Sequence, residues 1–528
     1  MKISRIFTLI ATLTLPCFTA GSYGQAPMQK ADTAKVQQKY LQRRYLQDIY
    51  NMAYSHTPSM LGLWEYPGYS NISASQTFAK GSFRDMQSYG QNSETKAETS
   101  SVLRLSQEWT LYGHFSYTNG SSKDVRNNLS YRKGNYLSPY YYIMKAPGDW
   151  SYQQYKFQGT AARSLVKGKL YAGASVLYNS HLDFRTVDYR NEQYNLHMEL
   201  NPSITYIAGK NSFSMGAVAT RGKTEPEIYS RYQQSNSSDD YQLYINTGLG
   251  SYIKNAPHST TTNEIGYGPS LSYKREGANS NLIVNYRLLF QSQDFLNKLT
   301  SSISEFGKEI GKYTASAHEV QALFSSLQDG LNGYIVNGNV AIINGTGSQY
   351  NNVSGSHIKN YTVSKQSAHL NVQRFKQDVM VPKLFATAGF ERKKEFDMNY
   401  GQSLQYSNLN MQLGMLGSIQ KGNSGEFAVE LSGEIGKNLG FEHDPKSAAE
   451  LFVTTQIANP LLSFATSDWW GISAKLVWSK FILDKYCADI ELYGSYKNPF
   501  GINYLPNQGY YSSKDNFLNA GINIVFNF

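Results

Sequence analysis

The last eleven residues of the chain, Leu518 to Phe528, alternate between apolar and mostly polar side chains. One set is wholly apolar and consists of Leu518, Ala520, Ile522, Ile524, Phe526 and Phe528. Because successive side chains of a strand point to opposite faces, this pattern predicts a strand with one apolar face. A tilted strand of this length can cross a bilayer. The pattern favours the closing strand of a transmembrane barrel, with Phe526 and Phe528 as its membrane-insertion signal, over the edge strand of a soluble β-sandwich.

Similar alternation recurs along the chain and predicts an all-β, closed antiparallel transmembrane barrel of about 16 strands, with about 14 as the alternative. The two N-terminal strands alternate least clearly. The predicted strands are residues 72–80, 98–106, 108–118, 154–164, 168–178, 196–207, 212–220, 264–275, 281–293, 366–376, 383–393, 409–420, 426–437, 471–481, 485–497 and 517–528.

The connections between these strands differ in length in a regular way. Short links at 164–168, 276–280, 421–425 and 482–484 join strands into hairpins, and long polar segments separate the hairpins. Short turns at one end and long loops at the other are typical of bacterial outer-membrane barrels. If the last strand ends in the periplasm, both termini are periplasmic and the strand number is even.

Residues 294–364 form a long interruption of this pattern. Apolar residues from Leu296 to Leu331 recur at alternating steps of three and four, which predicts one amphipathic helix or two helices broken near residues 311–316. Asn337-Gly338-Asn339 then lies between two apolar runs, a signal for a β-hairpin. We therefore expect an extracellular helix-plus-hairpin cap. We favour a rim that stabilises the mouth over a lid or a partner-binding surface.

The N-terminus has the features of a secretory signal over residues 1–24, with Lys2 and Arg5 before an apolar run. Residues 25–71 then form either a periplasmic tail or a segment inside the lumen, and the barrel occupies 72–528. Cys487 is the only thiol of the mature chain, so no intramolecular disulfide is possible. No later apolar run approaches the ~18 residues that a spanning helix needs.

Composition adds to the membrane interpretation. The chain has 42 Tyr, only 17% charged residues and a net charge of +10. Tyrosine favours membrane–water interfaces, and a positive charge suits anionic headgroups. We expect contact with outer-membrane lipid, lipopolysaccharide and the barrel-insertion machinery, and we leave open a protein partner at the extracellular loops. No nucleic-acid partner, cofactor or metal is expected.

Charged side chains on the polar faces of neighbouring C-terminal strands are the candidate lumenal residues. They are Glu426, Glu430, Glu434, Lys475, Asp489 and Glu491. Ordinary cross-strand pairing is one interpretation. The functional alternatives are an acidic wall that favours cations, or a wall that holds the basic N-terminal segment containing Lys39, Arg43 and Arg44.

Two other groups of residues are less specific. An aromatic-rich loop contains Tyr136, Tyr140, Tyr141, Tyr142, Trp150, Tyr152 and Tyr155, and we interpret it as an interfacial girdle. His114, His197 and His369 fall on polar faces of distant strands. None has the spacing of a metal site or a catalytic triad, so we expect no enzymatic activity.

Trp109–Gly120 (WTLYGHFSYTNG), Leu170–Arg190 and the terminal strand resemble an uncharacterised, domain-of-unknown-function family of Gram-negative outer-membrane β-barrel proteins. The resemblance covers most of the mature chain. The resemblance implies the fold and the location, and no activity is inferred from it. The function that we predict is a pore or transporter for a polar solute. The alternative is a non-conducting barrel anchor whose long extracellular loops bind a partner or assemble a surface complex.

Overall fold

The computed structural model describes residues 56–64, 68–130, 137–230, 242–254, 256–298, 309–328, 332–351, 353–375, 383–420, 426–444, 454–483, 486–504 and 511–528. The chain separates into two units, Met1–Asp48 and Ile49–Phe528, and every described residue belongs to the second. The expected signal segment 1–24 and the basic residues Lys39, Arg43 and Arg44 therefore lie outside the described residues.

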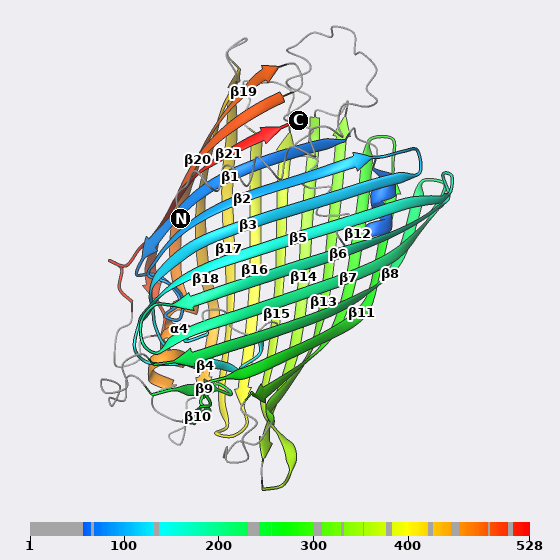
Figure 1. The fold of residues 1–528 in the computed structure, drawn as a ribbon. Coiled ribbons are helices and arrows are strands. Elements are labelled where there is room, and N and C mark those ends of the chain that lie inside the picture. Colours follow the sequence, from blue (N-terminus) through cyan, green and yellow to red (C-terminus); the bar gives the residue numbers. More distant parts are fainter. Residues whose placement is uncertain are drawn as a thin grey trace. The chain divides into compact units, whose positions relative to one another are not determined.

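Eighteen antiparallel strands form one continuous wall, in which each strand pairs with its neighbours in chain order (Figure 1). The wall strands are β1 (Tyr69–Gly81), β2 (Gln91–Arg104), β3 (Trp109–Val125), β5 (Gly148–Val166), β6 (Leu170–Arg185), β7 (Arg190–Ala208), β8 (Asn211–Tyr229), β11 (Thr260–Glu276), β12 (Ser280–Asn297), β13 (Glu309–Gln328), β14 (Asn332–Asn351), β15 (Ser356–Phe375), β16 (Lys383–Asp397), β17 (Gln402–Gln420), β18 (Glu426–Asp444), β19 (Ser467–Leu483), β20 (Tyr486–Ile502) and β21 (Phe517–Asn527).

The first and last wall strands pair with each other and close the sheet. Their register runs from Asn71 opposite Asn527 to Gly81 opposite Phe517. Beyond that register, the backbones of Ser70 and Phe528 exchange two hydrogen bonds of 2.8 and 2.9 Å. The predicted closed, all-β antiparallel barrel is confirmed.

The predicted number of about 16 strands is close to the observed eighteen but two too few, and the predicted helical insertion is wrong in the described part of the chain. All sixteen predicted strands overlap wall strands, and two further strands, β13 and β14, occupy most of residues 294–364. β14 passes without a turn through Gly338, which pairs with Ala322 on one side and Leu370 on the other. The described part of this region therefore contains wall strands in place of a helix-plus-hairpin cap.

Apolar residues on both faces of β13 explain the error. Val320 and Phe324 face outward and are 38% and 41% exposed, whereas Ala317 and Leu323 face inward and are both 3% exposed. When both faces of a strand carry apolar residues, the period of two is lost, and the combined spacing imitates the three-and-four steps of a helix.

The two faces of the wall differ in polarity elsewhere as the sequence predicts. On β21 the outward residues Phe526 and Phe528 are 47% and 39% exposed, while the inward Val525 and Asn527 are both 4% exposed. Leu413 and Tyr267, on other strands, are 68% and 66% exposed on the same outer face. The outer surface is thus a band of exposed large apolar side chains.

The two ends of the barrel have different connections. At one end, here called the turn end, short turns such as those between β5 and β6 or β7 and β8 connect strands, and both Tyr69 and Phe528 lie there. At the other end, here called the loop end, the longer connections contain η6 (Thr454–Ala458), α4 (Asn459–Ala465), and a small sheet of β4 (Tyr141–Ile143), β9 (Tyr244–Asn246) and β10 (Tyr252–Lys254). These elements gather at the lower end of Figure 1. No helix in the described part of the chain is long and apolar enough to cross a bilayer.

The seam between β21 and β1 gives a stability prediction. Tyr493 of β20 reaches across Gly521 of β21, and its hydroxyl lies 2.6 Å from Thr77 Oγ1 on β1. A Cβ atom on Gly521 would clash with the Tyr493 hydroxyl and would lie 2.7 Å from the carbonyl oxygen of Gln76. We expect Gly521→Val to destabilise the closed barrel by about 1–3 kcal/mol, the usual cost of overpacking.

The measurement is the temperature at which the folded band converts to the unfolded band on a denaturing gel. Gly494→Val is the matched control, because the nearest atom to a Cβ there is the carbonyl oxygen of Asn519, 3.7 Å away. Equal shifts for the two variants would contradict the prediction.

Candidate functional site: the lumenal wall and the segments folded against it

The candidate charged residues lie on the inner wall of strands β18 to β20 and pair across strands. Lys475 Nζ lies 3.2 Å from Glu491 Oε1, and Glu430 is the register partner of Lys475. Glu434 Oε2 lies 3.1 Å from Nζ of Lys497, a residue that the sequence analysis missed. Lys497 lies an even number of residues after Glu491 on β20, so both side chains face the same side of the strand. This spacing could have identified Lys497 from the sequence.

Neutral donors complete this group of residues. Asn523 donates to Glu491 Oε2 at 3.0 Å, and Asn527 donates to Asp489 Oδ2 at 2.9 Å. Cys487 lies against the same carboxylate, with Sγ 3.4 Å from Asp489 Oδ1. Glu426 begins β18, but its side chain is outside the described part of the structure. The structure thus brings together five of the six candidates.

The described side chains of this wall carry an excess of negative charge. Glu430, Glu434, Asp489 and Glu491 face the lumen beside Lys475 and Lys497 only. We call these six side chains the acidic ladder. An enclosed surface with one dominant sign of charge attracts solutes of the opposite sign.

Strands β7 to β12 carry a second set of inward ion pairs. Arg287 donates to Glu199 through two hydrogen bonds of 2.8 and 3.2 Å, a bidentate arrangement. His197 Nδ1 lies 3.4 Å from Glu264 Oε1, and Gln293 donates to Glu264 Oε2 at 3.2 Å. His197 was noted from the sequence, whereas its partners were not, because they are brought to it only by strand pairing. In the described part of the chain, no three His, Cys, Asp or Glu side chains form a group suited to a metal ion.

The N-terminal element η1 (Pro58–Leu63) lies against the inner wall at the turn end. Ser59 N donates to Ser203 Oγ at 2.8 Å, and Ser59 Oγ lies 2.7 Å from Thr205 Oγ1. Asn201 Nδ2 donates to the carbonyl oxygen of His56 at 3.1 Å, and Thr57 hydrogen bonds with Ser272 of β11. Residues 56–64 therefore share the enclosed space with the inward side chains of β7 and β11.

At the loop end, inward-folded segments form a compact body that we call the cap: residues 137–147, 242–254 and 454–466. Tyr140 stacks on Phe295 of β12 with ring centroids 5.8 Å apart, and Tyr142 packs in the same buried cluster. Burial raises the pKa of both hydroxyls above the ordinary tyrosine value, so they stay neutral. Leu249 packs with Leu462 of α4 in a neighbouring cluster.

The girdle interpretation of the aromatic-rich loop is wrong for most of its described members. Tyr140, Tyr141 and Tyr142 are core residues of the cap, and Trp150 and Tyr152 are buried at 1% and 4% exposure. Tyr155 alone among these is outward and 44% exposed. The sequence could not distinguish the two uses, because an aromatic run is equally suited to an interface and to a small apolar core.

Asp397, at the loop end of β16, fastens the cap to the wall. Its carboxylate is fully buried and accepts hydrogen bonds from Gly250 N at 2.9 Å and from Ser251 Oγ at 2.7 Å. Asn360 on β15 adds a third attachment, since its side-chain amide donates to the carbonyl oxygen of Thr247 at 2.7 Å. We refer to these contacts as the latch.

The comparison with protein families identifies one match, and it extends over residues 58–526. That family is described as a family of unknown function, DUF6850. This chain belongs to the DUF6850 family. The resemblance inferred from the sequence, to an uncharacterised family, is confirmed. No curated protein matches the chain.

Several solved structures are similar to this DUF6850 member at low identity. The ferric-catecholate import receptor Fiu from E. coli K12 is 9% identical, covers 88% of this chain and 82% of its own, and has a TM-score of 0.37. The ferric preacinetobactin receptor BauA from Acinetobacter baumannii is 9% identical, with 88% and 80% covered and a TM-score of 0.36. The CymD monoaromatic hydrocarbon channel is 10% identical, with 89% and 90% covered and a TM-score of 0.30. The barrel assignment rests on the strand pairing of this chain.

The position of η1 can be tested with a single substitution. A Cβ atom on Gly173 of β6 would lie 2.6 Å from Ser59 N and 2.7 Å from the carbonyl carbon of Pro58. We expect Gly173→Leu to displace η1 from the wall, because the new side chain occupies its backbone position.

The readout is maleimide labelling of Met60→Cys in a Cys487→Ser background, since Met60 is 0% exposed in the structure. Labelling is expected to be at least about tenfold faster when Gly173→Leu is added to this background, as a displaced segment loses its protection. Gly113→Leu is the control, because a Cβ there meets nothing within 4 Å. Equal labelling rates would show that η1 does not depend on this contact.

Proposed function

We propose that this DUF6850 protein is a gated barrel that carries a polar solute across the outer membrane. The observation that supports it is the continuous wall, which has exposed apolar side chains outside and paired charges inside. In hydrocarbon every backbone N–H and C=O must be paired within the protein, and a closed barrel achieves this. An inner surface of carboxylates and lysines is suited to water and polar solutes.

Strand length supports the membrane placement. A transmembrane strand needs about 9–11 residues, and the wall strands have from 11 residues in β21 to 20 in β14. Short turns face the periplasm in bacterial barrels, so we place the turn end, and with it both ends of the wall, on that side. The cap then lies at the extracellular mouth.

The segments inside the barrel support gating. The cap lies against the inner wall at the loop end, and η1 lies against it at the turn end. The latch adds the hydrogen bonds of Asp397 and Asn360 to the apolar contacts between cap and wall, so loss of the latch weakens the attachment of the cap. The acidic ladder favours a cation, or a solute with a basic group, as cargo.

The alternative is a non-conducting anchor whose extracellular loops bind a partner or assemble a surface complex. The buried core of the cap favours this candidate, because a well-packed cap can close the mouth permanently. We expect no enzymatic activity in either case. Conductance in planar bilayers distinguishes the transporter, which is expected to conduct, from the anchor, which is expected to stay closed.

We expect Asp397→Ala to raise the open probability in planar bilayers by at least about tenfold, because hydrogen bonds to a charged group contribute about 1.5–3 kcal/mol each. Asp294→Ala is the matched control, since Asp294 is an exposed carboxylate outside the lumen whose Oδ1 lies 3.7 Å from Lys312 Nζ. If Asp397→Ala stays as silent as the unmodified barrel, the transport proposal fails and the anchor is favoured.

Ion selectivity tests the acidic ladder in the Asp397→Ala background. Glu434→Gln combined with Glu491→Gln leaves Lys497 and Lys475 without their carboxylate partners. The reversal potential under a salt gradient is expected to move toward anions. Glu227→Gln removes an outward carboxylate, 3.4 Å from Lys298 Nζ, and should leave the reversal potential unchanged. An unchanged potential in the double variant would exclude the ladder as the selectivity element.

A further inference from the structure

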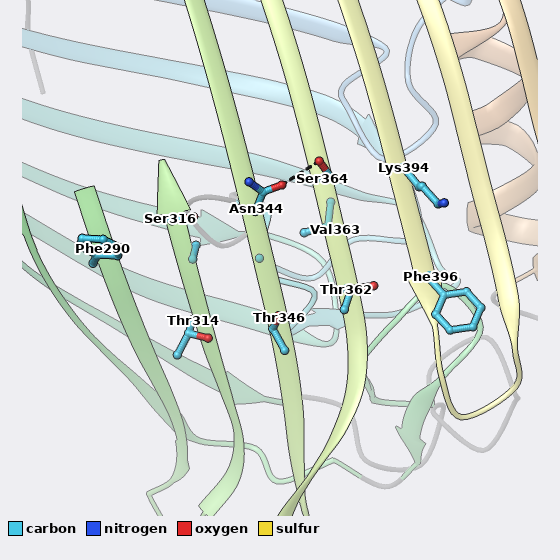
Figure 2. A pocket seen from close by; sticks show the side chains of 12 residues that line it. Phe290, Thr314, Ser316, Asn344, Thr346, Thr362, Val363, Ser364, Lys394 and Phe396 are labelled. Carbon is cyan, nitrogen blue, oxygen red and sulfur yellow. Dashed lines mark hydrogen bonds between the residues drawn. The ribbon is translucent and has the colours of Figure 1, made fainter. Parts of the chain in front are cut away.

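The outer wall has an open groove of mixed polar and apolar lining beside the apolar band, on strands β13 to β16 (Figure 2). Its volume is about 530 Å³, and Phe290 and Phe396 stand at its two sides. The floor consists of small outward side chains, and Ser364 donates to Asn344 Oδ1 at 2.8 Å across it. A groove that combines hydroxyl groups with apolar surface is suited to an amphiphilic occupant.

Strand register places the groove side chains in two rows. The row nearer the turn end consists of Ser316, Asn344, Ser364 and Lys394, which are successive register partners. The row nearer the loop end consists of Thr314, Thr346, Thr362 and Phe396. Each side chain of the two rows therefore faces the same side of the wall and presents a hydroxyl, an amide, an ammonium or an aromatic edge.

Two cations border one side of this groove. Lys394 is part of its lining, and Arg392 lies one outward position closer to the turn end on the same strand. Both are exposed, and neither has an ion-pair partner among the residues that the structure describes. Lys298, by contrast, is an exposed cation whose Nζ lies 3.4 Å from both Glu225 and Glu227. A pair of unneutralised cations attracts a phosphate group.

The apolar band begins directly on the turn-end side of the groove. Ile342, one outward position from Asn344 toward the turn end, is 37% exposed, and Val340 and Leu370 beyond it are 44% and 46% exposed. The wall thus offers an apolar surface on the turn-end side, two rows of mostly hydroxyl side chains and, beside them on β16, the two cations, with Arg392 in the same register row as Ile342. This arrangement matches an amphiphile whose acyl chains point toward the turn end and whose sugar carries a phosphate at its side.

We propose that this groove binds the headgroup of a phosphorylated glycolipid of the outer leaflet, the chemistry of lipid A. Arg392 and Lys394 hold the phosphate, the hydroxyl rows contact the sugar, and the acyl chains lie on the apolar band. The proposal rests on the membrane placement given above and does not depend on whether the barrel conducts.

The test reconstitutes the full-length barrel in vesicles and measures co-purified lipid by native mass spectrometry. The three probes are diphosphoryl lipid A, the same lipid without phosphates, and phosphatidylglycerol. Diphosphoryl lipid A is expected to be retained about tenfold more than the dephosphorylated form, in line with the usual contribution of basic residues near anionic headgroups.

Arg392→Gln with Lys394→Gln should abolish this difference, while Arg221→Gln, which removes an exposed outward arginine on β8, should leave it intact. Ser316→Phe fills the groove and keeps both cations, so it separates binding in the groove from general attraction of anions. Folding of each variant is checked by heat modification on gels.

Three results would overturn the proposal: equal retention of phosphatidylglycerol, normal retention by Ser316→Phe, or no effect of the double variant. Failure of the barrel to insert into any vesicle would instead refute the membrane placement. The two kinds of failure are therefore distinguishable.

Discussion

Pairing of the backbone in a closed ring is the constraint on which the rest of this structure depends. A sheet of eighteen strands in hydrocarbon would leave two rows of unpaired N–H and C=O groups unless β1 and β21 met. Once the ring is closed, alternate side chains face either the outer surface or an enclosed interior. Every functional feature described above follows from which of these two environments a side chain meets.

Segments that the wall itself holds fold into the interior at both ends. η1 hydrogen bonds to inward serine and threonine side chains, and the cap packs its tyrosines on inward aromatic residues. The two attachments differ in chemistry. Small hydroxyl side chains allow η1 to lie close to the wall, whereas the cap has an apolar core and accepts attachment from the buried carboxylate of Asp397 on β16.

Much of the wall could be predicted from sequence, and the limits have clear causes. Strands such as β21, with a wholly apolar outward face and a mostly polar inward one, show the period of two directly. β13 does not, because Leu323 is apolar and inward while Ser316 is polar and outward. The alternation along the sequence indicated that Glu434 and Glu491 face inward. Their partners depend on strand register, which alternation alone does not determine. The cap tyrosines were misassigned because burial by another loop is a tertiary property.

The contact between the first and last strands also determines when the fold can be completed. Asn71 and Asn527 lie on the first and last wall strands, so their pairing requires both ends of the wall sequence. The entropic cost of closing so long a loop grows only slowly with loop length and does not prevent the closure of the barrel. Until β1 and β21 pair, the sheet has two edge strands, each able to pair with a neighbouring chain. The pairing of β21 with β1 is therefore the step that converts an aggregation-prone sheet into a closed ring.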